Sequence, residues 1–243
     1  MSKDIQLSKK ILEYAESFSG IKAGIAVLED VLQGYSYQSE LSKDITKDVT
    51  LKWPDNAQSV LVIGLSHPSH SPELDWQRGI DTPGNQQLIR ISKNIANWIQ
   101  QELHLKAMQL PYHVEKGGLF LKDASVMAGL GVIGKNNLLV NPDFGSRIRL
   151  RSIIIEGKIK ATGPLTDFQP CKTCEVDCQN VCPQNAFPKG KYSRPICKNQ
   201  IDEDMKHKVS IGKSNENEKP KFVIKYCRKC ELICPIGNDE SSK

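Results

Sequence analysis

The chain has 243 residues, of which 39% are hydrophobic and 25% are charged, and its formal net charge is +5. This length allows one sizeable domain and a small second one. No apolar run approaches the roughly 18 residues that a membrane span needs, so no membrane embedding is expected. The first residues lack the pattern of a signal peptide or a twin-arginine pair, and we expect a cytoplasmic protein.

The amino-terminal segment predicts one helix and two strands. Apolar side chains at helical spacing predict a helix over residues 7–18, which Gly20 ends. The apolar run 21–28 predicts a strand, and Ser59–Leu65 (SVLVIGL) predicts a second, buried strand.

A polar, proline-rich loop is expected over residues 66–82. It contains His67 and His70, with only Glu73 and Asp75 as neighbouring acidic residues. Because no cysteine or third histidine stands near, we interpret both histidines as loop residues and not as metal ligands.

The next elements begin at Thr82-Pro83, which is a favourable helix start because a hydroxyl caps it and proline occupies the first position. Helical spacing continues to Leu103. A short strand is predicted at 112–114, a helix at 119–128 and a strand at 151–156. Strands and helices thus alternate, which indicates an α/β or α+β domain over residues 1–165.

The composition changes from Asp167 onward to cysteines, prolines and charges, so residues 166–243 are predicted to form a second domain. Within it, residues 206–221 are polar and are expected to form a surface loop. All eight cysteines lie between Cys171 and Cys234. A reducing compartment would keep these thiols available for metals, which argues against disulfides.

The cysteine spacing is that of a protein with two iron–sulfur clusters. Bacterial two-cluster ferredoxins use C-x2-C-x2-C-x3-C-P, where the last cysteine binds the other cluster. Here two runs end in Cys-Pro, at 171–183 and 227–235, and one cysteine stands between them. The crossing rule gives two sets: set one is Cys171, Cys174, Cys178 and Cys234, and set two is Cys182, Cys197, Cys227 and Cys230.

One spacing departs from this pattern. Three residues separate Cys174 from Cys178 where the ferredoxins have two, so a bulge must absorb one residue, and a [3Fe-4S] form at set one stays open. The alternative of two zinc sites does not require the Cys-Pro steps. Two [4Fe-4S] clusters would each add about two negative charges, which brings the protein near neutrality, so the basic excess does not indicate a nucleic-acid partner.

A glycine-rich segment, Ala128-Gly-Leu-Gly-Val-Ile-Gly-Lys135, matches two phosphate-binding patterns. As G-x-G-x-x-G it lacks the preceding strand of a dinucleotide site, because a helix is predicted before it. As a P-loop it carries Asn136 where the magnesium-binding Ser or Thr should stand. A glycine turn that allows close backbone packing is expected in either case.

This segment, followed by Asn137-Leu-Leu-Val-Asn141, Gly145-Ser146 and the cysteine layout of four, one and three, resembles epoxyqueuosine reductase. That family shares a core with the reductive dehalogenases. The resemblance implies an α+β fold, with a nitroreductase-like cobalamin-binding core and a carboxy-terminal ferredoxin-like domain that holds two [4Fe-4S] clusters. It maps cobalamin contacts to Gly129, Gly131, Gly134, Lys135, Gly145 and Ser146.

The resemblance also implies a catalytic acid, which counting back from Ala128 places at Glu115; Asp123 lies nearby as an alternative. A carboxylic acid could protonate the departing oxygen of an epoxide if burial raised its pKa. Two departures are the glutamate, where the family has aspartate, and Val132, where it has tryptophan.

Three arginines, Arg147, Arg149 and Arg151, alternate near the last predicted strand of the first domain and would share one face of it. They could meet an anionic substrate, but a solvated strand face is the favoured interpretation. No aromatic residues interleave them for base stacking, so nucleic acid has no support as a partner.

The resulting hypothesis is an iron–sulfur oxidoreductase that passes electrons through two clusters to a bound cobalamin. Its expected partners are a small-molecule or modified-nucleoside substrate and an external electron donor such as ferredoxin or flavodoxin. One alternative is an electron-transfer protein or corrinoid reductase that serves a separate enzyme. Another is a core that holds flavin.

Overall fold

The computed structural model of the chain describes residues 3–41, 51–212 and 221–237. These residues group into two compact units, each built from several segments. Unit 1 comprises the described parts of 1–66, 88–132 and 148–168, and unit 2 those of 67–87, 133–147 and 169–243. The units are therefore interleaved in sequence, and the division at residue 165 stays a prediction about independent domains.

Unit 1 is built on an antiparallel sheet of four strands in the order β1-β2-β6-β3. Its strands are β1 (Ile21–Val27), β2 (Ala57–Ser66), β6 (Ile148–Glu156) and β3 (Ala107–Gln109). The near-continuous apolar runs of β2 and β6 allow each of these central strands to be buried on both faces. The antiparallel order and the separate helices confirm the α+β fold class.

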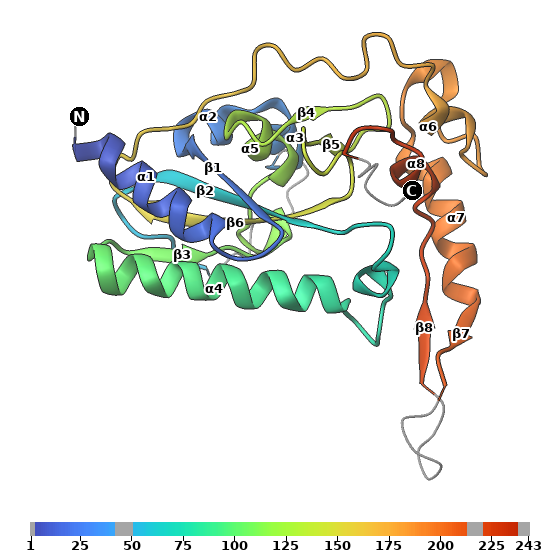
Figure 1. The fold of residues 1–243 in the computed structure, drawn as a ribbon, viewed down its shortest axis with the longest axis horizontal. Helices are drawn as coiled ribbons and strands as arrows, with labels where there is room; N and C mark the ends of the chain where they lie inside the picture. The colour runs from blue at the N-terminus through green and yellow to red at the C-terminus, as the bar shows by residue number, and fades with distance from the viewer. Residues whose placement is uncertain (1–2, 42–50, 213–220, 238–243) are drawn as a thin grey trace. The chain divides into compact units, whose positions relative to one another are not determined.

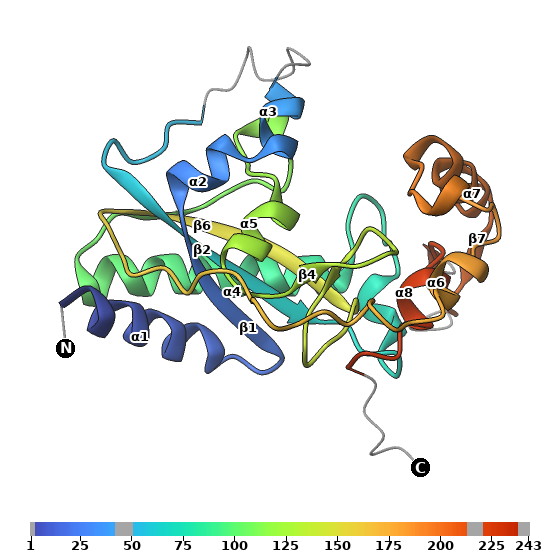
Figure 2. The same cartoon turned by 90° about the horizontal axis from the view of Figure 1, so that it is seen from above.

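Helices cover both faces of this sheet (Figures 1 and 2). Helix α1 (Lys3–Glu16) and helix α4 (Pro83–Leu103) pack on one face, where Ile11, Ile63, Ile95 and Ile153 belong to one buried cluster. On the other face lie α5 (Leu121–Met127) and α2 (Leu28–Gln33), which α3 (Tyr35–Leu41) follows.

Most of the elements predicted for unit 1 are present. The expected cap of α4 forms, since Thr82 Oγ1 accepts a hydrogen bond from the Asn85 amide at 3.2 Å. The strand predicted at 112–114 is wrong. Residues 114–116 form the 3-10 turn η2, and β3 lies earlier in the chain, where Ala107 pairs with Ile155 of β6.

The glycine-rich segment after α5 packs closely against its own unit. A side chain on Gly24 of β1 would lie 2.0 Å from the Ala128 carbonyl oxygen, and one on Gly129 would lie 2.3 Å from that of Gly163. Thr162 reinforces the contact, because its hydroxyl donates to the Ala128 carbonyl at 2.6 Å. The expected close backbone packing is present, and α5 precedes the segment where a dinucleotide site would have a strand.

Unit 2 contains short elements. They are η1 (Pro72–Asp75), β4 (Val132–Ile133, which begins at the last residue of unit 1), β5 (Leu139–Val140), α6 (Asp177–Asn180), η3 (Pro188–Gly190), α7 (Arg194–Lys206), β7 (Lys208–Ser210), β8 (Phe222–Ile224) and α8 (Lys229–Leu232). Strands β7 and β8 pair antiparallel where the sequence suggested only a surface loop over 206–221. Residues 213–220 of that predicted loop lie outside the described residues.

Candidate functional site

The first cysteine run folds as a loop followed by one helical turn. Cys171 and Cys174 lie in the loop, and Cys178 lies in α6. Between them Val176 has φ 59° and ψ 32°, a left-handed conformation that β-branched residues rarely adopt. The extra residue of the irregular spacing therefore coincides with a sharp local turn of the backbone.

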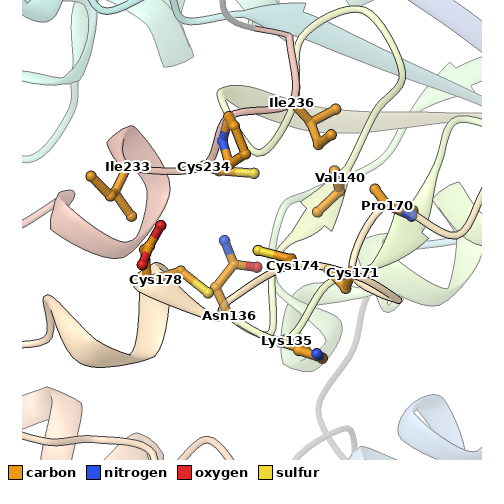
Figure 3. Close-up of a pocket in the computed structure, with 12 residues that line it drawn as sticks. Lys135, Asn136, Val140, Pro170, Cys171, Cys174, Cys178, Ile233, Cys234 and Ile236 are labelled. Atoms are coloured by element: carbon orange, nitrogen blue, oxygen red, sulfur yellow. The ribbon is translucent and has the colours of Figure 1, made fainter.

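The thiols of set one surround a common space. A cavity of about 400 Å³, part of it open solvent, is lined by all four of these cysteines together with residues of the 135–140 loop (Figure 3). Burial raises the pKa of the Cys178 thiol, and the other three thiols of the set raise it further. Cys234 thus lies with the first run although it is 56 positions away from Cys178 in the sequence.

The thiols of set two form a second group. Burial raises the pKa of Cys230 to about 12, with further contributions from Glu231 and from the other three thiols of the set. Cys197 lies in the first turn of α7, and Cys230 lies on α8. The side chain of Tyr192 hydrogen-bonds with Cys197, which together with burial raises the pKa of the phenol.

These two groups fit iron–sulfur clusters. Each brings four thiol donors together, which is the donor set of a [4Fe-4S] cluster, and set one encloses a cavity. A single zinc ion would need ligands at about 2.3 Å from one point. Among the described residues no three His, Cys, Asp or Glu side chains are grouped for one metal ion.

Side chains of the loop 133–147 hold the last cysteine run, 227–235, by donating hydrogen bonds to its main-chain carbonyls. Asn136 donates from its side-chain amide to the Cys230 carbonyl at 3.1 Å, and the Ser146 hydroxyl donates to the Glu231 carbonyl at 3.1 Å. Arg147 donates to the Cys234 carbonyl at 3.0 Å. Because these contacts fix the backbone of the ligand-bearing segment, they position the cysteines around the cavity.

An ionic network also fixes the last cysteine run. The Arg228 guanidinium pairs with Asp75 of η1 and with Glu231, and it donates to the His67 carbonyl at 3.0 Å. His67 is fully buried, and its Nδ1 lies 2.9 Å from Asp75 Oδ1. His67, which the sequence predicts to be a loop residue and not a metal ligand, supports this network in the structure.

The six residues that the family resemblance assigns to cobalamin are spread over both units. Gly129 and Gly131 belong to unit 1, and the other four belong to unit 2. A side chain on Gly145 would lie 1.9 Å from the Ile236 carbonyl oxygen, and Ser146 contacts Glu231 as described. Lys135 has an exposed side chain. Gly129, Gly145 and Ser146 therefore pack against the protein's own chain.

The expected acid, Glu115, lies on η2 in unit 1. Its side chain is 44% exposed, and His113 Nδ1 lies 3.3 Å from its Oε1. Asp123, the alternative, lies in the first turn of α5. The expectation of a solvated arginine face is wrong for Arg147 and Arg151, which are 3% and 6% exposed.

Comparisons with known proteins agree on one group. No family model matches the sequence. The chain is 24% identical over 258 residues to the epoxyqueuosine reductase of Lactococcus garvieae, which covers 100% of this chain and 69% of the relative. It is 29% identical over 193 residues to that of Leadbetterella byssophila, with 76% and 60% covered. The chain is similar in sequence to epoxyqueuosine reductases. The resemblance inferred from the glycine and cysteine motifs is confirmed.

Solved structures of other proteins share the fold of this chain. An epoxyqueuosine reductase in complex with an epoxyqueuosine-modified tRNA stem loop matches with a TM-score of 0.63 at 19% identity, over 96% of this chain and 66% of the other. A catabolic reductive dehalogenase matches with a TM-score of 0.56 at 19% identity, over 76% of this chain and 26% of the other. The chain thus spans about two thirds of the epoxyqueuosine reductases that it matches.

Several residues that contact the cysteine runs of this chain were not predicted from the sequence. Asn136 counted only as a misfit to the P-loop pattern, and Arg147 as one of three exposed arginines. Arg228 carried a weak signal, because a cation inside a C-x2-C pair that becomes buried needs an acidic partner. That partner, Asp75, lies 153 positions away in the sequence, so only the fold reveals it.

None of the described helices is apolar over enough length to cross a membrane.

Proposed function

We propose that this chain is an iron–sulfur oxidoreductase of the epoxyqueuosine reductase type, with one [4Fe-4S] cluster at each cysteine set. The observation that supports it best is the crossed grouping of the thiols, in which Cys234 joins the cavity of the first run. Thiolate clusters of this kind transfer single electrons at potentials set by burial and hydrogen bonding.

The short spacers between the sets would bring the two clusters close together. Cys178 of set one and Cys182 of set two are four residues apart, as are Cys230 of set two and Cys234 of set one. Helices α6 and α8, which carry Cys178 and Cys230, also contact each other. This arrangement supports electron transfer from one cluster to the other. The electrons would come from an external donor such as ferredoxin or flavodoxin.

The proposed acceptor of these electrons is cobalamin, which supplies a strongly reducing cobalt centre when it is bound. This part of the proposal rests on the family. The glycines 129, 131, 134 and 145 would offer backbone to the macrocycle. Gly129, Gly145 and Ser146 pack against the protein's own chain. Lys135, by contrast, has an exposed side chain, which is the proposed contact with cobalamin.

The proposed substrate is a small molecule or a modified nucleoside, by analogy with the relatives. One solved relative holds an epoxyqueuosine-modified tRNA stem loop. Glu115, which lies on η2 of unit 1, is the proposed proton donor. Its carboxylate is exposed, so a bound substrate would have to exclude water from it before it could act as a proton donor.

Anaerobic reconstitution tests the proposal. Full-length protein loaded with iron and sulfide should bind about eight irons, as two [4Fe-4S] clusters require, and a Cys171→Ala variant should bind about four. Added cobalamin should change its absorption spectrum, and a reduced sample should consume an epoxyqueuosine nucleoside. Zinc in place of iron, or a cobalamin spectrum unchanged at saturating protein, would contradict the corresponding part.

A second function, electron transfer to a separate corrinoid enzyme, is favoured by the internal packing of Gly145 and Ser146. Under this alternative the clusters would form without cobalamin binding. Reduced protein would then reduce a corrinoid partner in stopped-flow measurements while consuming no epoxide itself.

A further inference from the structure

Arg147 is a buried cation at the start of the segment that leads into β6. Its side chain donates to the Cys234 carbonyl at 3.0 Å and to the Ile236 carbonyl at 2.7 Å. The backbone at Gly145 packs against the same Ile236 carbonyl. The guanidinium therefore holds both ends of the Cys234-Pro-Ile236 segment that carries the crossed ligand of set one.

Among the described residues, Arg147 forms no ion pair with a carboxylate. In the part of the chain that the structure describes, the guanidinium meets carbonyl oxygens and forms no ion pair, although Arg147 is only 3% exposed. A buried charge without a counter-ion is costly. A thiolate-bound [4Fe-4S] cluster at set one would be anionic and would provide that counter-charge.

The surroundings of set two have the opposite sign. Glu231, which is 5% exposed and follows Cys230, shares Arg228 with Asp75. Two buried carboxylates thus surround one guanidinium. The exposed Asp177 and Lys135 at the set-one cavity are opposite in charge and are screened by solvent.

We propose that Arg147 is a positioning residue which fixes Cys234 and, through its buried charge, keeps the set-one cluster at a higher reduction potential than the set-two cluster. The inference rests on the proposed function, since it requires both clusters. A positive charge stabilises the reduced, more negative cluster, and a negative one destabilises it. With both clusters bound, one electron would pass from the set-two cluster, which would be oxidised, to the set-one cluster, which would be reduced, and the external donor would then reduce the set-two cluster again.

Redox titration of the reconstituted full-length protein, followed by electron paramagnetic resonance, tests this. A Cys171→Ala variant identifies the signal of set one. Arg147→Met should lower the set-one potential enough to change the ratio of oxidised to reduced cluster about tenfold, which is 59 mV for one electron. Arg147→Lys keeps the charge and should retain most of the potential. Glu231→Gln should raise the potential of set two.

Lys206→Met is the matched control, because it removes a positive charge whose side chain is 65% exposed and should leave both potentials unchanged. Equal shifts of both clusters in Arg147→Met, or no shift at full iron content, would overturn the inference. If Arg147→Met retains only about four irons, the result supports the role of Arg147 in fixing Cys234. The effect of buried charge on the potentials would then be tested by Glu231→Gln, and an unshifted set-two potential in that variant would overturn it. Wild-type protein that assembles no clusters would instead refute the proposed function.

Discussion

Different interactions stabilise the interiors of the two units of this protein. Unit 1 has a continuous apolar core in which Ile63 and Ile153 are completely buried between the sheet and two helices. Unit 2 has few buried apolar side chains, among them Val140, Ala186 and Val223, and relies on ionic pairs and on hydrogen bonds to main-chain carbonyls. A unit with so small a core needs a further source of stability, and the proposed cluster ligation would provide one.

Removal of iron should therefore produce the largest difference in stability between the two units. If cluster binding contributes to the folding of unit 2, chelation of iron under reducing conditions should remove amide protection from residues 169–212 and 221–237 and leave β2 and β6 protected. Hydrogen exchange measured by mass spectrometry on the full chain, before and after chelation, checks this. Equal loss of protection in both units would show that unit 1 also depends on the clusters.

Arg228→Met should have the next largest effect, because it leaves Asp75 and Glu231 as buried carboxylates without their guanidinium. Breaking a buried pair in this way costs about 3–5 kcal/mol. Iron content and the urea midpoint for loss of cluster absorbance should both fall. Lys229→Met removes an adjacent but exposed charge and should leave them nearly unchanged. Equal losses in both variants would mean that the network is unimportant.

Ile63→Ala tests the other side of the comparison. Ile63 is completely buried in β2, so truncation should cost about 2–5 kcal/mol of the stability of unit 1. Denaturant unfolding followed by circular dichroism would show the loss. The number of irons bound at 25 °C should stay at the wild-type value, and a loss of iron would indicate that unit 2 takes its stability from unit 1.

Val176→Gly should have the smallest effect. Glycine adopts the left-handed backbone of residue 176 without the strain that a β-branched side chain incurs, which is on the order of 1 kcal/mol. Iron binding should be retained, and the midpoint for cluster loss should stay the same or rise slightly. Val176→Pro cannot adopt a positive φ and should lose the set-one cluster. Similar iron contents in both variants would show that the turn at Val176 does not shape the site.

Local pattern predicted the parts of unit 1 that local interactions decide. The apolar spacing of residues 7–18 and 83–103 and the run SVLVIGL correctly indicated α1, α4 and β2, because each buries a regular face. The short edge strand β3 was misplaced to 112–114, since three residues carry no period and pairing with β6 decided the matter. The polar, exposed strand β7 likewise forms because β8 lies beside it.

The sequence by itself predicted two crossed sets of thiol ligands, because the cysteine spacings and the two Cys-Pro steps resemble those of two-cluster ferredoxins. It also indicated the similarity to epoxyqueuosine reductases. Only the tertiary structure decided which other residues serve those sets. Arg147 meets Cys234 and Arg228 meets Asp75 across long stretches of chain. Whether a charge is buried and what it faces depends on folding, and neither property is visible in the order of the residues.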